Sequence, residues 1–579
     1  MTVRVTFIHC PERLYAELQN NGVVFMPVWA YTLAAHLPND GTYAISLFDT
    51  RIDSLAEVPE ADIFLFSGIN QDFTNLCVTH DELRGRFPSA RTVIGGPICW
   101  SFDQAGDLGK LDRFDHIVIG DGEHLINPIL DAIRTNTDLD HVVRSPARFE
   151  IAKSKELHWP LVEATYARYY GAVIEVSRGC PFLCEFCDIR VMQDNNRPHN
   201  KPVEIIMAEI DRLAGLGVNR FLMACDNFIG DPSWAESVVD AIIAWIAKTG
   251  RRPSFYTWMT INLYKMPGLI KKLRLANFDA VFIGIESFNS NSLIETAKMQ
   301  NTAGELVGAI KEIQSYGLMV IAGLIFGFDS DGDDCFEQTL DGIVESGLLS
   351  GDPSLLTALP GTPLFKRMKM THRLREVRYG LGGYKYQTNI LYLQPRDAII
   401  AGYGRFVDTF SRGEYQYRRL KAFFDNLDRG NYIPITGSGY INYSGALKVI
   451  LRSRTAALQV VRRLAFFSIP PTNYYWVARA LLLVLGRPHI AQRFGYLRVW
   501  FALWTNVLLR YKKLSARDFD IDSVKEGFDF QSILTEEYRT GSMETDVVLN
   551  KARAQRKFTV RALEDLMRSK ESARTGTAG

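Results

Sequence analysis

The sequence predicts an α/β protein with three parts: a doubly wound N-terminal domain, a central partial (βα)6 barrel and a mostly helical C-terminal region. Two stretches show short apolar runs alternating with amphipathic helical runs, one over residues 1–150 and one over residues 151–375. In a third stretch, basic and aromatic residues interleave with short apolar runs. Alternating runs are typical of parallel strands joined by right-handed helical crossovers.

The N-terminal domain is expected to hold five strands, at 3–8, 43–48, 63–67, 92–94 and 117–119, with helices such as 26–36 and 73–86 between them. Glycines follow the fourth strand (Gly95, Gly96) and the fifth (Gly120, Gly122). Glycine at a strand end lets backbone approach a large flat ligand. A generic nucleotide-binding fold is the alternative interpretation of this doubly wound pattern.

The barrel is expected to hold six strands, at 172–177, 220–224, 254–259, 280–286, 319–326 and 354–359, with helices such as 202–216, 234–248 and 303–316 in the gaps. In barrels of this kind the chemistry lies where the carboxyl ends of the strands meet their loops. The most distinctive motif of the chain directly follows the first of these strands.

The composition is that of an ordinary globular protein, with 47% hydrophobic and 23% charged residues and a net charge of +1. The five cysteines outside the motif described next are scattered, which favours a reducing, cytoplasmic location over a disulfide framework. Residues 1–8 resemble a strand rather than a signal peptide. No apolar run reaches 18 residues, so a membrane-spanning helix is not expected.

Cys180, Cys184 and Cys187 form a C-x3-C-x2-C motif. Three thiolates on one short loop can bind three irons of a four-iron, four-sulfur cluster and leave the fourth iron open to chelate a small ligand. Zinc normally takes four ligands, often from two C-x2-C pairs, and there is no second pair here. Buried structural thiols are the other alternative.

With Phe186 before the last cysteine, this motif resembles the signature of the radical S-adenosylmethionine (SAM) enzymes. The resemblance implies that reductive cleavage of SAM gives a 5′-deoxyadenosyl radical, which abstracts hydrogen from an unactivated carbon. It also implies that residues at the strand ends bind SAM. These are Asp226 and Asn227 for the amino group, Glu286 and Ser287 for the ribose or carboxylate, Gly323 and Gly327 for the adenosine, and the segment 360–363 near the adenine.

Residues 94–97 and 120–123 resemble the cobalamin-binding domain that precedes the barrel in one radical SAM class. This implies cobalamin contacts from Ser67, Gly68, Gly95, Gly96, Pro97, Gly120, Gly122 and Glu123. The D-x-H-x-x-G motif is absent, so no histidine ligand to cobalt is expected, and residues 67–70 are expected to cover its lower face. A competing assignment is a tRNA methylthiotransferase whose Cys10, Cys77 and Cys99 would hold a second cluster.

Residues 180–424 resemble a branch that includes hopanoid C-2 methylases and bacteriochlorophyll side-chain methylases, with 376–435 as its C-terminal extension. This implies a cobalamin-dependent C-methyltransferase acting on a small apolar substrate, such as a lipid, isoprenoid or tetrapyrrole, with flavodoxin or ferredoxin as electron donor. That branch more often has Asp where this chain has Cys225. The alternatives are a radical cyclase that forms a ring by oxidation, the methylthiotransferase, and a non-catalytic cobalamin-binding protein.

Residues 436–579 form the last region. Residues 429–517 contain no Asp or Glu but many Lys, Arg, Trp, Tyr and Phe. Helices with basic and aromatic faces bind the headgroup region of anionic membranes, which predicts peripheral contact with the cytoplasmic membrane face. The alternatives are a helical subdomain with a basic solvated face and, less favoured, a nucleic-acid surface. The charged tail, 536–579, is expected to be disordered.

Overall fold

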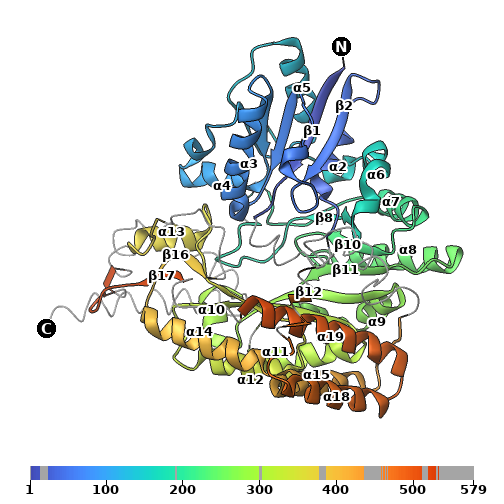
Figure 1. The fold of residues 1–579 in the computed structure, drawn as a ribbon, viewed down its shortest axis with the longest axis vertical. Helices are drawn as coiled ribbons and strands as arrows, with labels where there is room; N and C mark the ends of the chain where they lie inside the picture. The colour runs from blue at the N-terminus through green and yellow to red at the C-terminus, as the bar shows by residue number, and fades with distance from the viewer. Residues whose placement is uncertain are drawn as a thin grey trace.

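The computed structural model describes residues 2–12, 24–189, 192, 194–298, 301, 303–376, 386–435, 458, 461–462, 464–465, 467–511, 519–529 and 532–533. Its N-terminal domain stands at one end of the long axis, the barrel strands lie in the middle, and the helices α14, α15, α18 and α19 lie at the other end (Figure 1). The tail predicted to be disordered, 536–579, lies outside the described residues.

The N-terminal domain contains a parallel sheet in the order β2-β1-β3-β4-β5-β6. Its apolar strand residues pack against helices on both faces, as expected of a doubly wound sheet. The strands are β1 (Val3–His9), β2 (Tyr43–Asp49), β3 (Ile63–Ser67), β4 (Arg91–Gly95), β5 (His116–Ile119) and β6 (Val142–Arg144), and the helices are α2 (Val28–Ala34), α3 (Phe73–Arg86), α4 (Pro97–Ala105) and α5 (Ile126–Thr135).

The second sheet is also parallel and follows chain order, β14-β13-β12-β11-β10-β7, which makes an open, partial barrel. The strands are β7 (Ala172–Glu175), β10 (Arg220–Ala224), β11 (Ser254–Met259), β12 (Phe278–Glu286), β13 (Met319–Phe326) and β14 (Asp352–Leu355). The helices are α6 (Trp159–Thr165), α7 (Val203–Gly215), α8 (Pro232–Thr249), α9 (Pro267–Leu275), α10 (Ser290–Glu295), α11 (Ala303–Ser315), α12 (Cys335–Ser346) and α13 (Pro363–Met370).

Local capping explains where the barrel helices begin. Asp231 caps α8 by accepting from Trp234 N at 3.1 Å, and Pro232 occupies the first helical position, where it costs no hydrogen bond. Thr362 caps α13 in the same way, by accepting from Phe365 N at 3.1 Å. The segment 360–363 therefore has a structural role as a helix start, next to its expected role near adenine.

The C-terminal region adds a layer of helices to the barrel and a small two-stranded parallel sheet. That sheet pairs segments far apart in sequence, and Gln387 lies opposite Asp520. Trp500 and Trp504 are buried in a core shared with α15. The elements are β16 (Gln387–Tyr392), α14 (Arg396–Ser411), α15 (Gly413–Leu427), α18 (Thr472–Leu485), α19 (Ile490–Tyr511) and β17 (Asp520–Ser523).

This packing corrects one part of the membrane prediction. Trp500, Trp504 and Phe467 belong to the aromatic residues of 429–517 from which membrane contact is predicted, but each is no more than 1% exposed. Arg487 and Arg493 are likewise neutralised within the fold, because both donate to Asp428 of the segment that follows α15. The basic residues Lys448, Arg452, Arg454, Arg463, Lys512 and Lys513 lie outside the described residues.

Candidate functional site

The cysteine loop leaves the barrel directly after β7. It begins with the short strand β8 (Ser177–Arg178), which pairs antiparallel with β9 (His199–Asn200) and so ties the loop to the chain that returns from it. Gly179 has a φ of +93°, and a Cβ there would lie 2.1 Å from the carbonyl oxygen of Arg197. Only glycine fits this position, so the loop that carries the cysteines has a fixed starting point.

The three thiols lie near one another. The pKa of Cys180 is raised to about 11, first by burial and, to a smaller extent, by the neighbouring Cys184. Burial also raises the pKa of Cys187, with contributions from Asp188, Cys184 and Cys180. Within the described residues, no three metal-ligating side chains converge on a single ion. That arrangement is compatible with a cubane cluster, because its three thiolates bind three separate irons.

A buried ion pair lies beside the cysteines. Lys298 Nζ lies 2.5 Å from Glu286 Oε1 and 5.6 Å from the centroid of the Phe186 ring. Burial alone would lower the pKa of Lys298, but the carboxylate of Glu286 and the thiols of Cys184 and Cys187 raise it above its usual value. A fixed cation next to three thiolates suits a site that must hold negative charge.

Asp226 and Asn227 follow β10 and border the same loop. Asp226 Oδ2 accepts from the backbone N of Gly179 at 2.5 Å, and burial raises the pKa of Asp226 to about 6. Asn227 is 2% exposed, and neither its amide nitrogen nor its amide oxygen has a hydrogen-bond partner among the described residues. A buried amide with two unmet bonds fits a polar ligand such as an amino-acid headgroup.

Of the other residues expected to bind SAM, Glu286 and Gly323 lie together, whereas Gly327 and Ser287 have local structural roles. Glu286 has a φ of +65° and lies at a register shift in β12. A Cβ added to Gly323 would lie 3.7 Å from the carboxylate of Glu286. These two residues are therefore neighbours. Gly327 differs, since a Cβ there would lie 2.6 Å from the Tyr392 ring, so packing already requires glycine. Ser287 Oγ accepts from Asn289 N at 3.0 Å in a local turn.

A cavity of about 360 Å³ lies between the N-terminal domain and the barrel. Seven of the eight residues expected to contact cobalamin line it: Ser67, Gly95, Gly96, Pro97, Gly120, Gly122 and Glu123. From the barrel side it is lined by Glu175, Arg178, Asn195 and Asp226. The cavity thus reaches from the strand ends of the first sheet to the cysteine loop, and Trp29 and Trp100 give it aromatic walls.

Gly68 is the exception. It lies outside the cavity lining, and a Cβ there would lie 2.7 Å from Leu76 Cδ1. Its carbonyl oxygen accepts from the backbone N of Ile98 at 3.1 Å. In this structure Gly68 serves packing between β3 and α4, while its neighbour Ser67 reaches the cavity.

Sequence reasoning missed the residue that links the two parts of the site. Arg178 donates to both oxygens of Glu175, at 2.8 and 2.9 Å, to Asp121 Oδ1 at 3.2 Å, and also to Glu123. Burial alone would raise the pKa of Glu175, but the guanidinium of Arg178 lowers it. The sequence does place an arginine next to the cysteine motif and two acidic residues among the glycines of residues 120–123. It gives no indication, however, that the arginine forms ion pairs with these acidic residues.

The structure also bears on the cysteines proposed for a second cluster. Cys10 and Cys99 are buried in the core on one face of the first sheet, at 1% and 0% exposed. The pKa of Cys10 is raised mainly by burial and, to a smaller extent, by Asp72. The pKa of Cys99 is raised by burial. Such thiols behave as small apolar side chains rather than as metal ligands.

Comparison with known proteins gives the family of the barrel. Residues 174–343 match the family described as the Radical SAM superfamily. The hopanoid C-2 methylase of Rhodopseudomonas palustris is 26% identical over 399 residues, which cover 66% of this chain and 71% of that protein. The bacteriochlorophyllide d C-12(1)-methyltransferase of Chlorobaculum tepidum is 25% identical over 214 residues, covering 36% of this chain and 45% of that protein.

A solved structure resembles nearly the whole fold. The cobalamin-dependent SAM radical enzyme OxsB, with aqua-cobalamin and SAM bound, superposes with a TM-score of 0.54 at 14% sequence identity, covering 93% of this chain and 84% of that one. At this identity the likeness shows the fold. The matched family shows that the protein is an enzyme in which residues 174–343 form a radical SAM domain.

Proposed function

We propose that this protein is a cobalamin-dependent radical SAM C-methyltransferase that methylates an unactivated carbon of an apolar small molecule. The observation that carries the proposal is the cavity that joins the expected cobalamin residues to the cysteine loop. The proposal divides the chain into a cobalamin-binding domain (1–150), a radical SAM barrel (151–375), an extension (376–435) and a helical region (436–579). The names of the relatives, a hopanoid methylase and a bacteriochlorophyllide methyltransferase, support an apolar substrate.

The chain's own residues supply binding, orientation and exclusion of water. Cys180, Cys184 and Cys187 would hold the cluster, while Asn227 and Glu286 would bind SAM. When bound, these cofactors supply the electron and the methyl group for hydrogen abstraction and methylation. The Lys298–Glu286 pair is at most 10% exposed and lies beside Phe186, so bulk water has little access to that side of the site.

The cobalamin side is built for a large flat ligand. The glycines at 95, 96, 120 and 122 expose backbone to the cavity, and the aromatic rings of Trp29 and Trp100 face the same space. None of the described residues that line the cavity is a histidine, so the proposal includes no histidine ligand to cobalt. A Co(II) paramagnetic spectrum without nitrogen coupling from the protein would support this arrangement.

The test is an anaerobic assay of the reconstituted protein with reductant, cobalamin and SAM carrying a deuterated methyl group. Separate reactions receive a hopanoid or other isoprenoid lipid extract and a tetrapyrrole extract. The proposal predicts formation of 5′-deoxyadenosine and a product that carries the labelled methyl group, and neither should form with the Cys184→Ala variant. A ring-forming cyclase would instead give a product that has lost hydrogen without gaining the label.

We also propose that α18 binds the cytoplasmic face of an anionic membrane. Its large apolar side chains are exposed, with Leu482 at 68% and Leu485 at 57%, and the basic side chain of Arg479 is exposed among them. No described helix is long and apolar enough to cross a bilayer. The exposed large apolar residues of this region are Leu458, Val461, Leu464, Ile469, Tyr474, Tyr475, Leu481, Leu482, Leu485 and Ile490.

Membrane binding of this kind would anchor the protein rather than feed substrate straight into the cavity, because α18 and the N-terminal domain lie at opposite ends of the long axis (Figure 1). The proposal predicts that the protein floats with vesicles containing anionic lipid, and that Leu482→Glu with Leu485→Glu prevents this. Val78→Glu, at an exposed apolar position of α3, is the matched control. Equal flotation of the double variant and the unaltered protein would contradict it.

A further inference from the structure

Glu185 stands inside the cysteine motif, between Cys184 and Cys187, yet its side chain is only 3% exposed. Arg367 of α13 binds both of its carboxylate oxygens, with Nε to Oε1 at 2.8 Å and Nη2 to Oε2 at 3.0 Å. Two parallel charge-assisted bonds fix the plane of a carboxylate as well as its distance. The backbone of Glu185 is also held, since its N donates to Thr296 O and its O accepts from Leu364 N.

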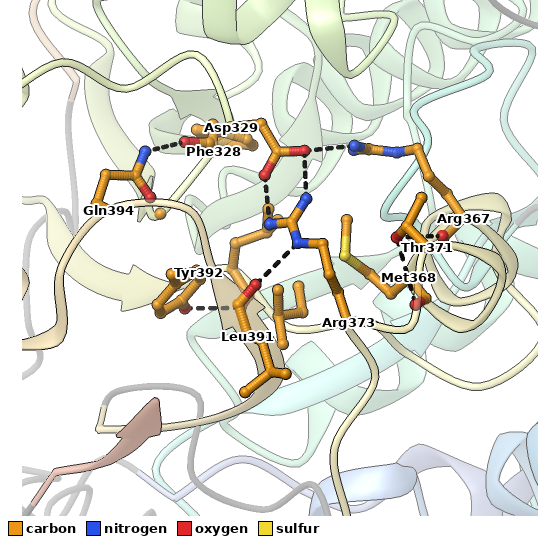
Figure 2. A network of polar contacts seen from close by, with 12 residues as sticks. Phe328, Asp329, Arg367, Met368, Thr371, Arg373, Leu391, Tyr392 and Gln394 are labelled. Atoms are coloured by element: carbon orange, nitrogen blue, oxygen red, sulfur yellow. Dashed lines mark hydrogen bonds and ion pairs between the residues drawn. The ribbon is translucent and has the colours of Figure 1, made fainter. Parts of the chain in front are cut away.

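Arg367 itself is held by two further carboxylates. Its Nη1 donates to Asp329 Oδ2 at 2.6 Å, and its Nη2 lies 3.2 Å from Glu295 Oε1. Figure 2 shows Asp329 between the guanidinium groups of Arg367 and Arg373, and Arg373 binds both oxygens of Asp329 at 2.9 and 2.6 Å. Glu295 in turn accepts from the backbone N of Ser330 at 2.8 Å.

This network connects the cysteine loop to the ends of other barrel strands. Asp329 lies three residues after the end of β13, and Glu295 closes α10, which follows β12. The segments that follow β12 and β13, the strands that carry residues proposed to bind SAM, are therefore joined to Glu185 through one guanidinium group. Buried ion networks are seldom worth more to stability than well-packed apolar residues, so a role in geometry explains this one better.

We infer that Arg367 is a positioning residue that sets where the segment from Cys184 to Cys187 lies relative to the ends of β12 and β13. The inference rests on the proposed function, since it takes the three cysteines as cluster ligands. In the proposed role, Arg367 need not contact the cluster or SAM itself. It acts through Glu185, and its effect is the alignment between the cluster and SAM.

The test is Arg367→Lys, which keeps the positive charge but loses the forked geometry. Each protein is reconstituted with iron and sulfide under anaerobic conditions, and the reduced cluster is followed by electron paramagnetic resonance during titration with SAM. Iron content should stay near that of the unaltered protein, because all three thiolates remain. The SAM concentration needed for the SAM-induced spectral change should rise about 10-fold or more, the usual effect of losing a partner that orients metal ligands.

The matched control is Arg220→Lys. Arg220 forms a buried ion pair with Asp279 and begins β10, at the end of the barrel strands remote from the cysteine loop. This variant should lower stability without moving the SAM titration. If Arg367→Lys fails to fold by circular dichroism, Glu185→Gln gives the same test from the other partner, and the same shift is expected.

The outcomes separate the two proposals. A folded Arg367→Lys or Glu185→Gln variant with an unaltered spectrum and SAM titration would overturn the positioning role. An equal shift in Arg220→Lys would also overturn it, since the effect would then be one of general stability. If the unaltered protein bound no iron through its cysteines, the proposed function itself would be wrong.

Discussion

Arg178 and Asp121 join the two halves of the site, with Nη1 of the guanidinium 3.2 Å from Oδ1 of the carboxylate. Arg178 lies two residues before Cys180, and Asp121 lies in the glycine-rich turn after β5. Both residues line the cavity between the domains. This ion pair therefore holds the turn expected to contact cobalamin against the loop expected to hold the cluster.

Replacing Arg178 should separate radical formation from methyl transfer. In Arg178→Lys the charge remains, but one ammonium group cannot hold Glu175, Asp121 and Glu123 at once. We expect 5′-deoxyadenosine to form at near the normal rate, while labelled methyl product falls about 10-fold. The two products are measured in the same anaerobic assay by mass spectrometry.

Arg144→Lys is the control for this prediction, because Arg144 pairs with Asp103 on the surface of the N-terminal domain, at 2.6 Å, and is not itself among the residues that line the cavity. It should leave the ratio of the two products unchanged. If Arg178→Lys reduced both products in parallel, Arg178 would be acting on the cluster alone.

Cys184→Ala should abolish the absorbance of the reconstituted cluster and all formation of 5′-deoxyadenosine. Two thiolates cannot hold a cubane that needs three protein ligands. Cys335→Ala is the control, since that thiol is buried on α12, in another part of the barrel. Retention of normal iron content and SAM cleavage by Cys184→Ala would show that the cysteine motif had been misassigned.

Filling the cavity at Gly95 should weaken cobalamin binding. A Cβ at Gly95 has room, with Val118 Cβ 3.7 Å away, so Gly95→Leu should fold and place its remaining atoms in the space that the corrin would occupy. We expect the cobalamin dissociation constant, measured by equilibrium dialysis, to rise about 10-fold or more. Gly85→Leu, on the exposed face of α3, should leave it unchanged; equal binding by all three proteins would argue against this cavity as the site.

Much of the fold was predictable from local sequence. The expected bounds of β3, β10, β11, β13 and α3 agree with the structure, since each is an apolar or amphipathic run with clear breaks. The last barrel strand was misplaced: 354–359 was expected, but β14 is Asp352–Leu355. The pairing with β13 ends at Leu355, which lies opposite Phe326. Beyond it, the backbone oxygens of Leu356 and Ala358 accept hydrogen bonds from side chains of β16 (Thr388 and Asn389) in place of a strand backbone.

What the sequence did not reveal depends on partners far apart in the chain. The strand pair β16–β17 joins segments separated by more than 120 residues, and β6 is too short to give a pattern. Glu185 and Arg367 are 182 residues apart, and Arg178 and Asp121 are 57 apart. The cysteines could be found because one short loop carries all three, whereas the arginines that position this loop are recognised only once the strand ends are brought together.

The pH dependence of stability should include a contribution from His9, at the end of β1. Its Nδ1 accepts from Trp29 Nε1 at 3.2 Å, and burial, assisted by Arg51, lowers the pKa of His9 from 6.5 to about 4, although Asp49 opposes the shift. Between these values the unfolded chain takes up a proton that the folded protein does not. The contribution of His9 to the free energy of unfolding is therefore fully present above pH 6.5 and is lost as the pH falls toward 4.

The loss attributable to His9 should be at most about 3 kcal/mol, because a pKa shift of one unit corresponds to about 1.4 kcal/mol. His9→Gln keeps an acceptor for Trp29 but cannot be protonated, so its melting temperature should fall less between pH 7.5 and pH 5 than that of the unaltered protein. His141→Gln, at a half-exposed position, should behave like the unaltered protein. Parallel changes in melting temperature for His9→Gln and the unaltered protein across this range would mean that His9 does not contribute to the acid response of the protein.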